Sequence, residues 1–257
     1  MAFGGYLGSS LFSNAIAASP YLPQQYGYAD WVPSQCYYAF AAAAGCFGPP
    51  ALPQNNISNS VFQCLVGKDT HTLQNASAAV SGASRIGTWG FLPVTDGVFI
   101  QQLPSQQLLR KELNSVNLLV GNNADEGPAF TPQNVQTETD FTTFIQNTFP
   151  LFTPSDIEKA RANNLYAEST FVCPSYWMAE AFTGSGRKAY KYQYSVVGAQ
   201  HGADVSGYFG PAALNQRDDF VKAFMTIWGN FITKNDPSIS AEIADGANGT
   251  GDGVGFD

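Results

Sequence analysis

The chain has 257 residues, of which 44% are hydrophobic and only 12% are charged, so it is long and apolar enough to bury a sizeable core. Its formal net charge of −8 argues against a nucleic-acid or anionic-membrane partner, because both attract clusters of lysine and arginine. No apolar run reaches the roughly 18 residues that a membrane-spanning helix needs.

The first predicted element is a short strand within residues 11–18 (LFSNAIAA), which follows the end of a helix and closes at Ser19. A helix is predicted over residues 33–44, with a proline at its start and Gly45 as its stop signal. Two shorter helices complete this part of the chain, over residues 60–66 with Asn59 as cap and over residues 70–80.

Cysteines and sequons point to an oxidising compartment. Four cysteines are present, and four allow three pairings. Cys46 and Cys64 flank a loop rich in proline and asparagine, where a bridge would remove about 3 kcal/mol of unfolded-state entropy. Glycosylation sequons begin at Asn56, Asn75 and Asn248, although such triplets also arise by chance. Since the opening MAFGGYLGSS lacks the features of a signal peptide, we interpret the chain as part of a secreted protein whose N-terminal part is not in this sequence.

Residues 117–130 (NLLVGNNADEGPAF) place an acid just beyond a predicted strand. The apolar run from Leu118 to Val120 is typical of a buried parallel strand. Gly121 is predicted to end the strand, and the polar residues after it to form a tight turn that presents Glu126. Because ligands of open α/β sheets bind at the carboxyl ends of the strands, Glu126 is a candidate site residue, with a solvated loop acid as the alternative.

The remaining elements are mostly helices. Residues 189–197 (AYKYQYSVV) alternate aromatic and polar side chains, which is typical of a strand. Residues 218–233 carry apolar side chains at helical spacing, with two acids in the first turn. The other predicted elements are two short extended pieces within residues 91–100 and helices over residues 104–113, 140–149, 154–163 and 174–182.

His201 lies in a second turn that follows a predicted strand, within GAQHGAD. Small neighbours leave its ring exposed, and a loop histidine without a role is the alternative. Glu126 and His201 could face one another, with the carboxylate accepting the Nδ1 proton of the imidazole. A nucleophile would precede both in the chain order of α/β-hydrolases, but no G-x-S-x-G turn is present. The other histidine, His71, is predicted to be a surface residue on a polar helix.

Together these motifs resemble the C-terminal half of a type-B carboxylesterase, the cholinesterase-like branch of the α/β-hydrolases, and the secreted fungal esterases most of all. The resemblance implies an α/β fold with a mostly parallel sheet flanked by helices, present here as one partial domain over residues 1–257 without its N-terminal half. Residues 241–257 are rich in glycine and aspartate and are expected to form a frayed tail. The motifs that carry the resemblance are LFSNAIAASPYLP (11–23), the loop between Cys46 and Cys64, FLPVTDGVFI (91–100), GNNADEG (121–127) and HGAD (201–204).

The resemblance assigns roles to individual residues. It implies that Glu126 is the acid of a catalytic triad and that His201 is its general base. The nucleophilic serine and the oxyanion-hole loop of the family lie upstream of this chain, so these residues alone are expected to be inactive. Asp204 and Ser19 are candidates for a supporting role behind the pair, with a surface acid and a turn serine as the alternatives.

Other residues are given weaker roles. Phe130, Tyr208 and Phe209 are candidates for the wall of an apolar substrate pocket, with core packing as the alternative. The loop composition and the resemblance together predict a Cys46–Cys64 disulfide. Buried free thiols are predicted for the two remaining cysteines, Cys36 and Cys173.

The predicted function is hydrolysis of small-molecule carboxylic esters through an acyl-enzyme intermediate. Neither a cofactor nor a metal is expected, since two histidines so far apart make no metal-ligand pattern. The alternative is a non-catalytic cholinesterase-like domain used for binding or adhesion. The presence of both Glu126 and His201 favours the enzyme, while the particular ester and the oligomeric state stay open.

Overall fold

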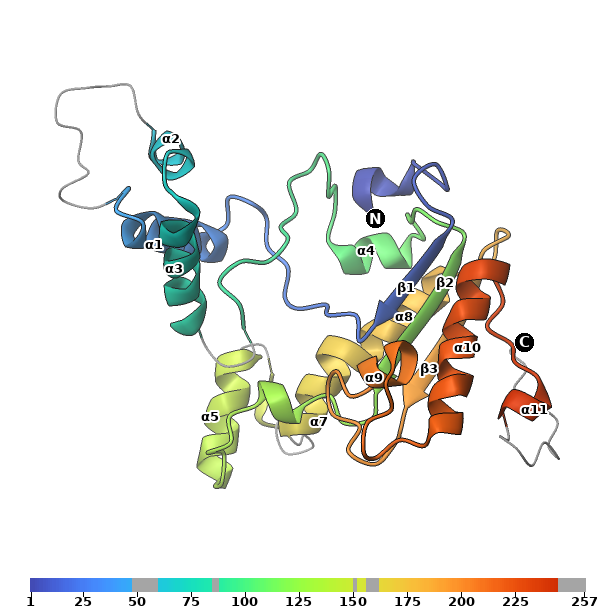
Figure 1. Ribbon diagram of the computed structural model, residues 1–257. Coiled ribbons are helices and arrows are strands. Elements are labelled where there is room, and N and C mark those ends of the chain that lie inside the picture. The colour runs from blue at the N-terminus through green and yellow to red at the C-terminus, as the bar shows by residue number, and fades with distance from the viewer. Residues whose placement is uncertain (48–59, 85–87, 150–151, 156–161, 245–257) are drawn as a thin grey trace. The chain divides into compact units, whose positions relative to one another are not determined.

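The computed structural model describes residues 1–47, 60–84, 88–149, 152–155 and 162–244 (Figure 1). The chain divides into two compact units. One unit, Met1–Leu22 with Pro104–Asp257, contains the β-sheet, and the other, Pro23–Leu103, is helical. In the described part of the chain, no helix is long and apolar enough to cross a membrane.

The sheet has three parallel strands in the order β1-β2-β3, which are Asn14–Ala18, Asn117–Asn123 and Lys188–Tyr194. In register, Ala18 lies opposite Gly121, and Asn123 lies opposite Tyr194. The carboxyl ends of all three strands therefore meet at one edge of the sheet (Figure 1). Gly121 does not end the strand as predicted from the sequence, because β2 continues to Asn123.

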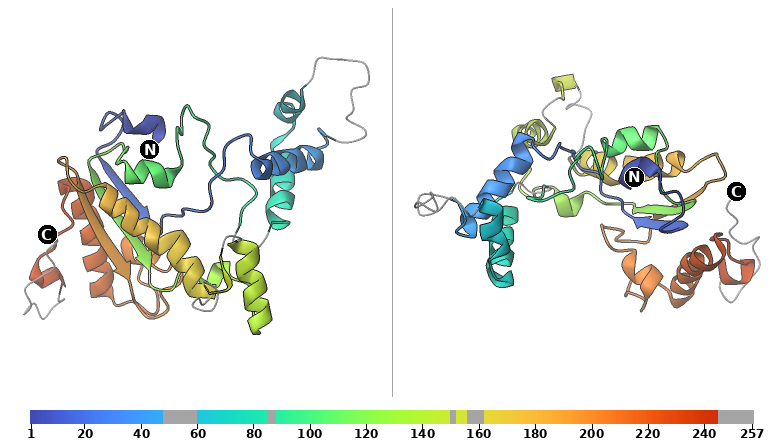
Figure 2. Two further views of the ribbon diagram at one scale, coloured as in Figure 1. Left: turned by 180° about the vertical axis from the view of Figure 1, so that it is seen from behind. Right: turned by 90° about the horizontal axis from the view of Figure 1, so that it is seen from above.

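Helices cover both faces of this sheet, as the view from above shows (Figure 2). Leu118 and Val120 point to the face covered by α4 (Pro104–Leu109) and α8 (Cys173–Ala181). Leu119 points to the opposite face and packs with Phe231 of α10 (Asp218–Lys234). Burial on both faces explains why β2 has a continuous apolar run instead of an alternating one. The predicted α/β fold class is thus confirmed.

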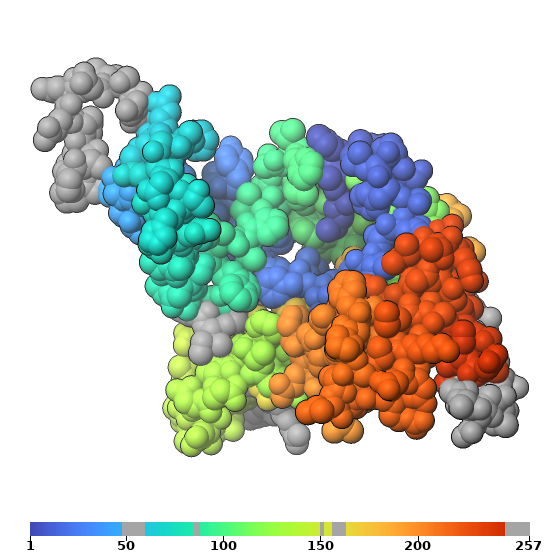
Figure 3. Space-filling model, viewed as in Figure 1, coloured from blue at the N-terminus to red at the C-terminus, as the bar shows by residue number. Residues whose placement is uncertain are grey.

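The long helix α10 matches the prediction from its apolar spacing. Its residues Val221, Phe224 and Phe231 are buried. Asp218 and Asp219 lie in its first turn and Lys234 in its last, where each charge is favourable to the helix dipole. The space-filling view shows α9 and α10, in orange and red, as one continuous face of this unit (Figure 3).

Shorter helical segments complete the sheet-containing unit. The predicted helix from Pro104 ends at Leu109, not at residue 113, because the chain turns at Lys111 with a positive φ of 56°. Most of the helix predicted over residues 154–163 lies outside the described residues. The segments are η1 (Ala2–Gly5), η3 (Pro128–Phe130), α5 (Glu138–Thr148), α7 (Ala162–Ala167), the π-helix η4 (Glu168–Val172), α9 (Val205–Phe209) and α11 (Ala241–Ala244).

The helical unit consists of α1 (Trp31–Ala43), α2 (Val61–Val66) and α3 (Thr70–Gly82). Ala41 and Ala76 are buried where α1 and α3 pack together, and their small side chains permit that approach. Ser60, not Asn59, caps α2, and forms a reciprocal capping box with Gln63. The extended pieces predicted within residues 91–100 are reduced to a single bridge from Thr95 to Gly27.

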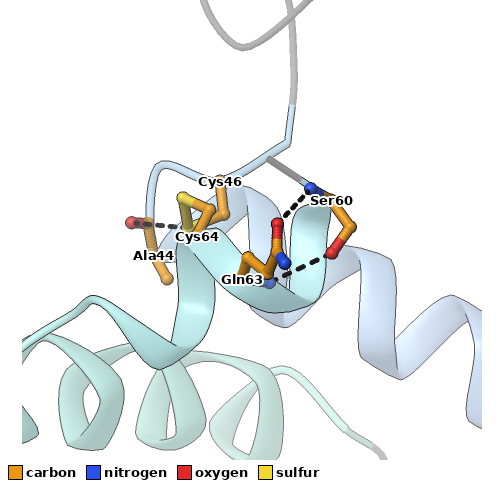
Figure 4. Close-up of a disulfide and its surroundings, with 5 residues drawn as sticks. All are labelled: Ala44, Cys46, Ser60, Gln63 and Cys64. Atoms are coloured by element: carbon orange, nitrogen blue, oxygen red, sulfur yellow. Dashed lines mark hydrogen bonds between the residues drawn. A yellow bond between two sulfur atoms is a disulfide. The ribbon is translucent and has the colours of Figure 1, made fainter. Parts of the chain in front are cut away.

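Cys46 and Cys64 form a disulfide that joins the end of α1 to α2 (Figure 4). Their Cα atoms are 5.6 Å apart, and the two residues are 18 positions apart in the chain. Cys36 and Cys173 are free thiols, but both are partly exposed, so the prediction that they are buried is wrong. The disulfide therefore closes the loop that the sequence singled out.

Removing this bridge is expected to destabilise the helical unit. A Cys46→Ser, Cys64→Ser double variant should lose about 3 kcal/mol of unfolding free energy, because the open loop regains its unfolded-state entropy. Denaturant titration measures the loss, and Cys36→Ser is the matched control because it removes a cysteine without opening a loop. Peptide mapping under non-reducing conditions that joins Cys36 to Cys46 or Cys64 would contradict the pairing.

Candidate active site

The carboxyl-terminal edge of the sheet brings together three segments that are distant in sequence. The turn after β2 is tied to the segment after β3 by backbone hydrogen bonds. In these, the Ala124 N–H donates to the Tyr194 carbonyl and the Asp125 N–H to the Ala199 carbonyl, both at 2.9 Å. The end of β1 joins them, since the Ser19 N–H donates to the Gly121 carbonyl at 2.8 Å. Side chains on these segments therefore lie within reach of one another.

Glu126 and His201 form a hydrogen-bonded pair. The distance from His201 Nδ1 to Glu126 Oε2 is 2.6 Å. Glu126 is completely buried, whereas 34% of the His201 side chain is exposed. An ionised carboxylate can only accept, so Nδ1 carries the shared proton and the Nε2 of a neutral ring keeps its lone pair. Such a ring can take a proton at Nε2.

The second oxygen of Glu126 is held by the ends of two strands. Glu126 Oε1 accepts from the Ser19 hydroxyl at 2.6 Å and from the Asn123 N–H at 2.5 Å. Ser19 has a left-handed backbone with φ of 51°, an unusual conformation for a residue other than glycine. Because the Ser19 hydroxyl donates its hydrogen to Glu126, it does not donate to His201 Nε2. Ser19 therefore supports the acid and is not in the position of a nucleophile.

These contacts set the pKa of Glu126. Burial acts to raise its pKa, but hydrogen bonds from His201, Ser19 and the Asn123 N–H outweigh burial and hold the pKa below the ordinary value of 4.5. The carboxylate is therefore ionised at neutral pH.

This depressed pKa predicts a pH-dependent contribution to stability. The contribution of ionised Glu126 is fully present above pH 4.5, the ordinary pKa, and is lost as the pH falls through the lower pKa of the folded state. The difference in unfolding free energy between the wild type and Glu126→Gln should therefore shrink as the pH is lowered below 4.5. Denaturant titrations at a series of pH values measure this, and a constant difference across the series would contradict it.

Two aromatic rings flank the imidazole of His201. Phe130 lies edge-on to it, with ring centroids 4.9 Å apart and an interplanar angle of 81°. Phe171, which is buried, lies at 4.8 Å with an angle of 39°. Phe171 belongs to the π-helix η4, and Tyr166 stacks on Phe130 with centroids 5.5 Å apart. The pair thus lies against an apolar aromatic wall.

Asp204 is buried behind the pair and bonded to two side chains. Tyr192 donates its hydroxyl to Asp204 Oδ2 at 3.0 Å, and Asn123 Nδ2 donates to Asp204 Oδ1 at 3.2 Å. Burial, followed by the negative charge of Asp204, raises the pKa of Tyr192. The ring of Tyr192 lies over Gly121, where an added Cβ would come within 2.1 Å of it. Glycine is required at this position for that close approach, which explains why it occurs inside a strand.

Tyr208 and Phe209 lie away from the pair. Tyr208 stacks on Trp228 of α10 with ring centroids 3.8 Å apart. Burial, followed by the charge of Asp204, raises its pKa to about 12. Phe209 packs edge-on against Tyr208 and is 70% exposed. Of the three aromatic residues predicted to line a pocket, the structure brings only Phe130 against His201.

The remaining predicted residues belong to other elements of the chain. His71 and Asn75 are exposed neighbours on α3 of the helical unit, with 3.2 Å between Asn75 Nδ2 and His71 Nδ1. Asn56 and Asn248 lie outside the described residues.

No group of three potential metal ligands occurs among the residues that the structure describes. A groove of about 330 Å³ lies between α4 and α8 and is lined partly by Trp177 and Leu109, not by the pair.

Sequence reasoning missed three residues of this site, which are Asn123, Phe171 and Tyr192. The sequence predicts Asn123 to be a turn residue, and its place three residues before Glu126 is the signal that could have identified it. Phe171 and Tyr192 carry no motif, and only tertiary packing reveals them. Within the described residues, no hydroxyl or thiol group donates a hydrogen bond to His201 Nε2.

Comparison with known proteins shows several similarities. The sequence model of a family described as the carboxylesterase family matches residues 7–153, more than half of the chain. Secreted lipase 4 of Gibberella zeae is 22% identical over 235 residues, covering 79% of this chain and 41% of the lipase. Mouse thyroglobulin is 33% identical over 124 residues, covering 47% of this chain and 4% of thyroglobulin.

A solved structure is similar as well. The crystal structure of EstA of Aspergillus niger matches with a TM-score of 0.72 and 20% identity, covering 92% of this chain and 51% of EstA. This likeness establishes an esterase-type α/β-hydrolase fold. The chain spans about half the length of EstA, and less than half the length of secreted lipase 4 and of thyroglobulin.

Proposed function

Because the chain belongs to the carboxylesterase family, we propose that it contributes the acid and the base of a Ser-Glu-His ester hydrolase. Glu126 is the acid and His201 the general base. The observation that carries this proposal is the 2.6 Å hydrogen bond between His201 Nδ1 and buried Glu126 at the carboxyl edge of a parallel sheet. An intact pair of this geometry favours an enzyme over a binding or adhesion domain.

The pair supplies proton transfer in both halves of the reaction. His201 Nε2 takes the proton of a serine hydroxyl as the serine oxygen attacks the ester carbonyl carbon. The same proton then passes to the leaving alcohol as the C–O bond breaks and an acyl-enzyme remains. Water attacks the acyl-enzyme in the second half, with His201 again accepting and returning a proton. Glu126 holds the ring in the required tautomer and stabilises the imidazolium.

The serine and the oxyanion hole are proposed to lie upstream of Met1. The sequence contains no G-x-S-x-G turn, and Ser19 already donates its hydroxyl to Glu126. The chain covers 41% of the secreted lipase and 51% of EstA, which leaves room for such a segment. Residues 1–257 are then the C-terminal portion of one α/β-hydrolase domain.

The substrate is proposed to be a small-molecule carboxylic ester. Phe130 and Phe171 offer an apolar wall beside His201, suited to the acyl or alcohol group of an ester. The similarity to a protein named secreted lipase 4 and the Cys46–Cys64 disulfide support a secreted location. Of the three sequons, Asn75 is exposed on α3 and is proposed to be glycosylated.

Assay of the full-length product of the gene with a short-chain nitrophenyl ester tests the function. Hydrolysis that is blocked by an organophosphate, with mass spectrometry locating the adduct on a serine, is the expected result. Sequencing of the transcript upstream of Met1 provides an independent check, since a G-x-S-x-G turn in frame is expected there. A full-length product that neither hydrolyses the ester nor takes up the organophosphate would refute the proposal.

A further inference from the structure

Two consecutive asparagines end strand β2, and both are completely buried. Asn122 faces α8, and its Oδ1 accepts from Ser175 Oγ at 3.2 Å and from Lys191 Nζ at 2.8 Å. Asn123 faces the opposite way, because successive side chains of a strand alternate between the two faces. The two residues have the same chemistry and burial, but only Asn123 reaches the candidate active site.

The side-chain amide of Asn123 lies where three segments meet. Its Nδ2 is 3.2 Å from Asp204 Oδ1, 3.3 Å from Ser19 Oγ and 3.4 Å from Glu126 Oε1. The Asn123 main chain adds the N–H bond to Glu126 Oε1 at 2.5 Å. One residue thus contacts the acid, the end of β1 and the segment that carries His201.

The orientation of this amide follows from the charges around it. Two of the three neighbours of Nδ2 are carboxylates, which accept hydrogen bonds and repel a carbonyl oxygen. Turning the amide over would direct Oδ1 at both of them. In the present orientation Oδ1 is buried without a hydrogen-bond partner among the described residues, so the site uses this amide only as a donor.

We propose that Asn123 is a positioning residue that ties the turn of Glu126 to the loop of His201 through Asp204. Asp204 lies three residues after His201 and is the N-cap residue of α9. Tyr192 holds its other oxygen, so the Asn123 amide fixes the start of α9 relative to β2. His201 is thereby held where its Nδ1 meets Glu126. This inference rests on the proposed function in taking the pair as catalytic.

Asn123→Ala is expected to lower kcat about 10²-fold with little change in KM, because a small displacement of the general base costs about that much. Asn122→Ala is the matched control. It removes an equally buried amide from the neighbouring residue, so its thermal stability should fall similarly while kcat changes by less than about threefold. Both variants are made in the full-length product of the gene. Equal losses of kcat in the two variants, or no loss in either, would overturn the proposal.

A second measurement separates this inference from the proposed function. The proton between His201 Nδ1 and Glu126 should give a low-field NMR resonance without any substrate, to be assigned by its loss in His201→Gln. The resonance should persist in Asn122→Ala and be lost or broadened in Asn123→Ala. If the wild type hydrolyses no ester, the proposed function fails, but this comparison still tests the positioning role. An unchanged resonance in Asn123→Ala would overturn it.

Asp204→Ala removes the carboxylate that accepts the hydrogen bond from the Asn123 amide. This variant tests the proposal if Asn123→Ala does not fold. It should reproduce the loss of kcat and of the resonance. Combined with Asn123→Ala, it should add little, because either change alone has already broken the link. Wild-type kcat and an unchanged resonance in Asp204→Ala would show that no positioning passes through this link.

Discussion

His201→Ala in the full-length product is expected to lower kcat/KM for a nitrophenyl ester by about 10⁶-fold, the order of loss seen when a serine protease loses its general base. In the proposed mechanism, the Nε2 of His201 accepts the serine proton. Without it, the serine attacks as a neutral hydroxyl. Steady-state assays of purified protein measure the loss.

The chain offers a matched control for this experiment. His71 is the only other histidine, and it is exposed on α3 of the helical unit. His71→Ala should keep wild-type activity. Glu126→Gln should fall between the two at about 10⁴-fold, because a glutamine amide can select the wrong imidazole tautomer. Full activity in His201→Ala would remove His201 from the mechanism.

The chain of residues 1–257, expressed by itself, is expected to hydrolyse the same ester no faster than buffer. The general base then has no nucleophile to activate, and loss of the nucleophile costs about 10⁶-fold in turnover. The residual rate in such variants comes from the oxyanion hole, which is proposed to lie upstream as well. The outer edge of β1 would also be left unpaired among the described residues, so low solubility is expected.

The two proteins should be assayed side by side at equal concentration, with the full-length product as the positive control. His201→Ala in the short chain guards against trace contamination. Turnover by the short chain well above buffer that disappears in this variant would reveal a nucleophile within residues 1–257. The proposal that the serine lies upstream of Met1 would then be wrong.

The sheet could be predicted from sequence because its strands have local signatures. The apolar run at Leu118 to Val120 marked β2, and the alternating aromatics before Tyr194 marked β3. The prediction failed at Gly121, where a glycine was interpreted as the end of the strand. Tertiary packing explains this glycine, since the ring of Tyr192 from the neighbouring strand occupies the space that a Cβ at position 121 would fill.

The candidate site was predictable only in part. Glu126 and His201 stood out because each is a titratable residue in a turn just after a strand. The sequence predicts Asn123 to be a turn residue, and its proposed role depends on a hydrogen bond to Asp204, which is 81 positions away. Phe171 of the π-helix η4 lies beside His201, and no local pattern in the sequence indicates either the π-helix or this contact.

The parallel pairing of the three strands also has a consequence for folding. Parallel strands cannot be joined by tight hairpins, so every pairing in this sheet closes a long stretch of chain. Ser19 and Glu126 are 107 positions apart, and Glu126 and His201 are 75 apart. Contacts of such high order form slowly, because loop closure must precede any gain from the contact. Recovery of the Glu126–His201 hydrogen bond during refolding should therefore follow the pairing of β1, β2 and β3, and not precede it.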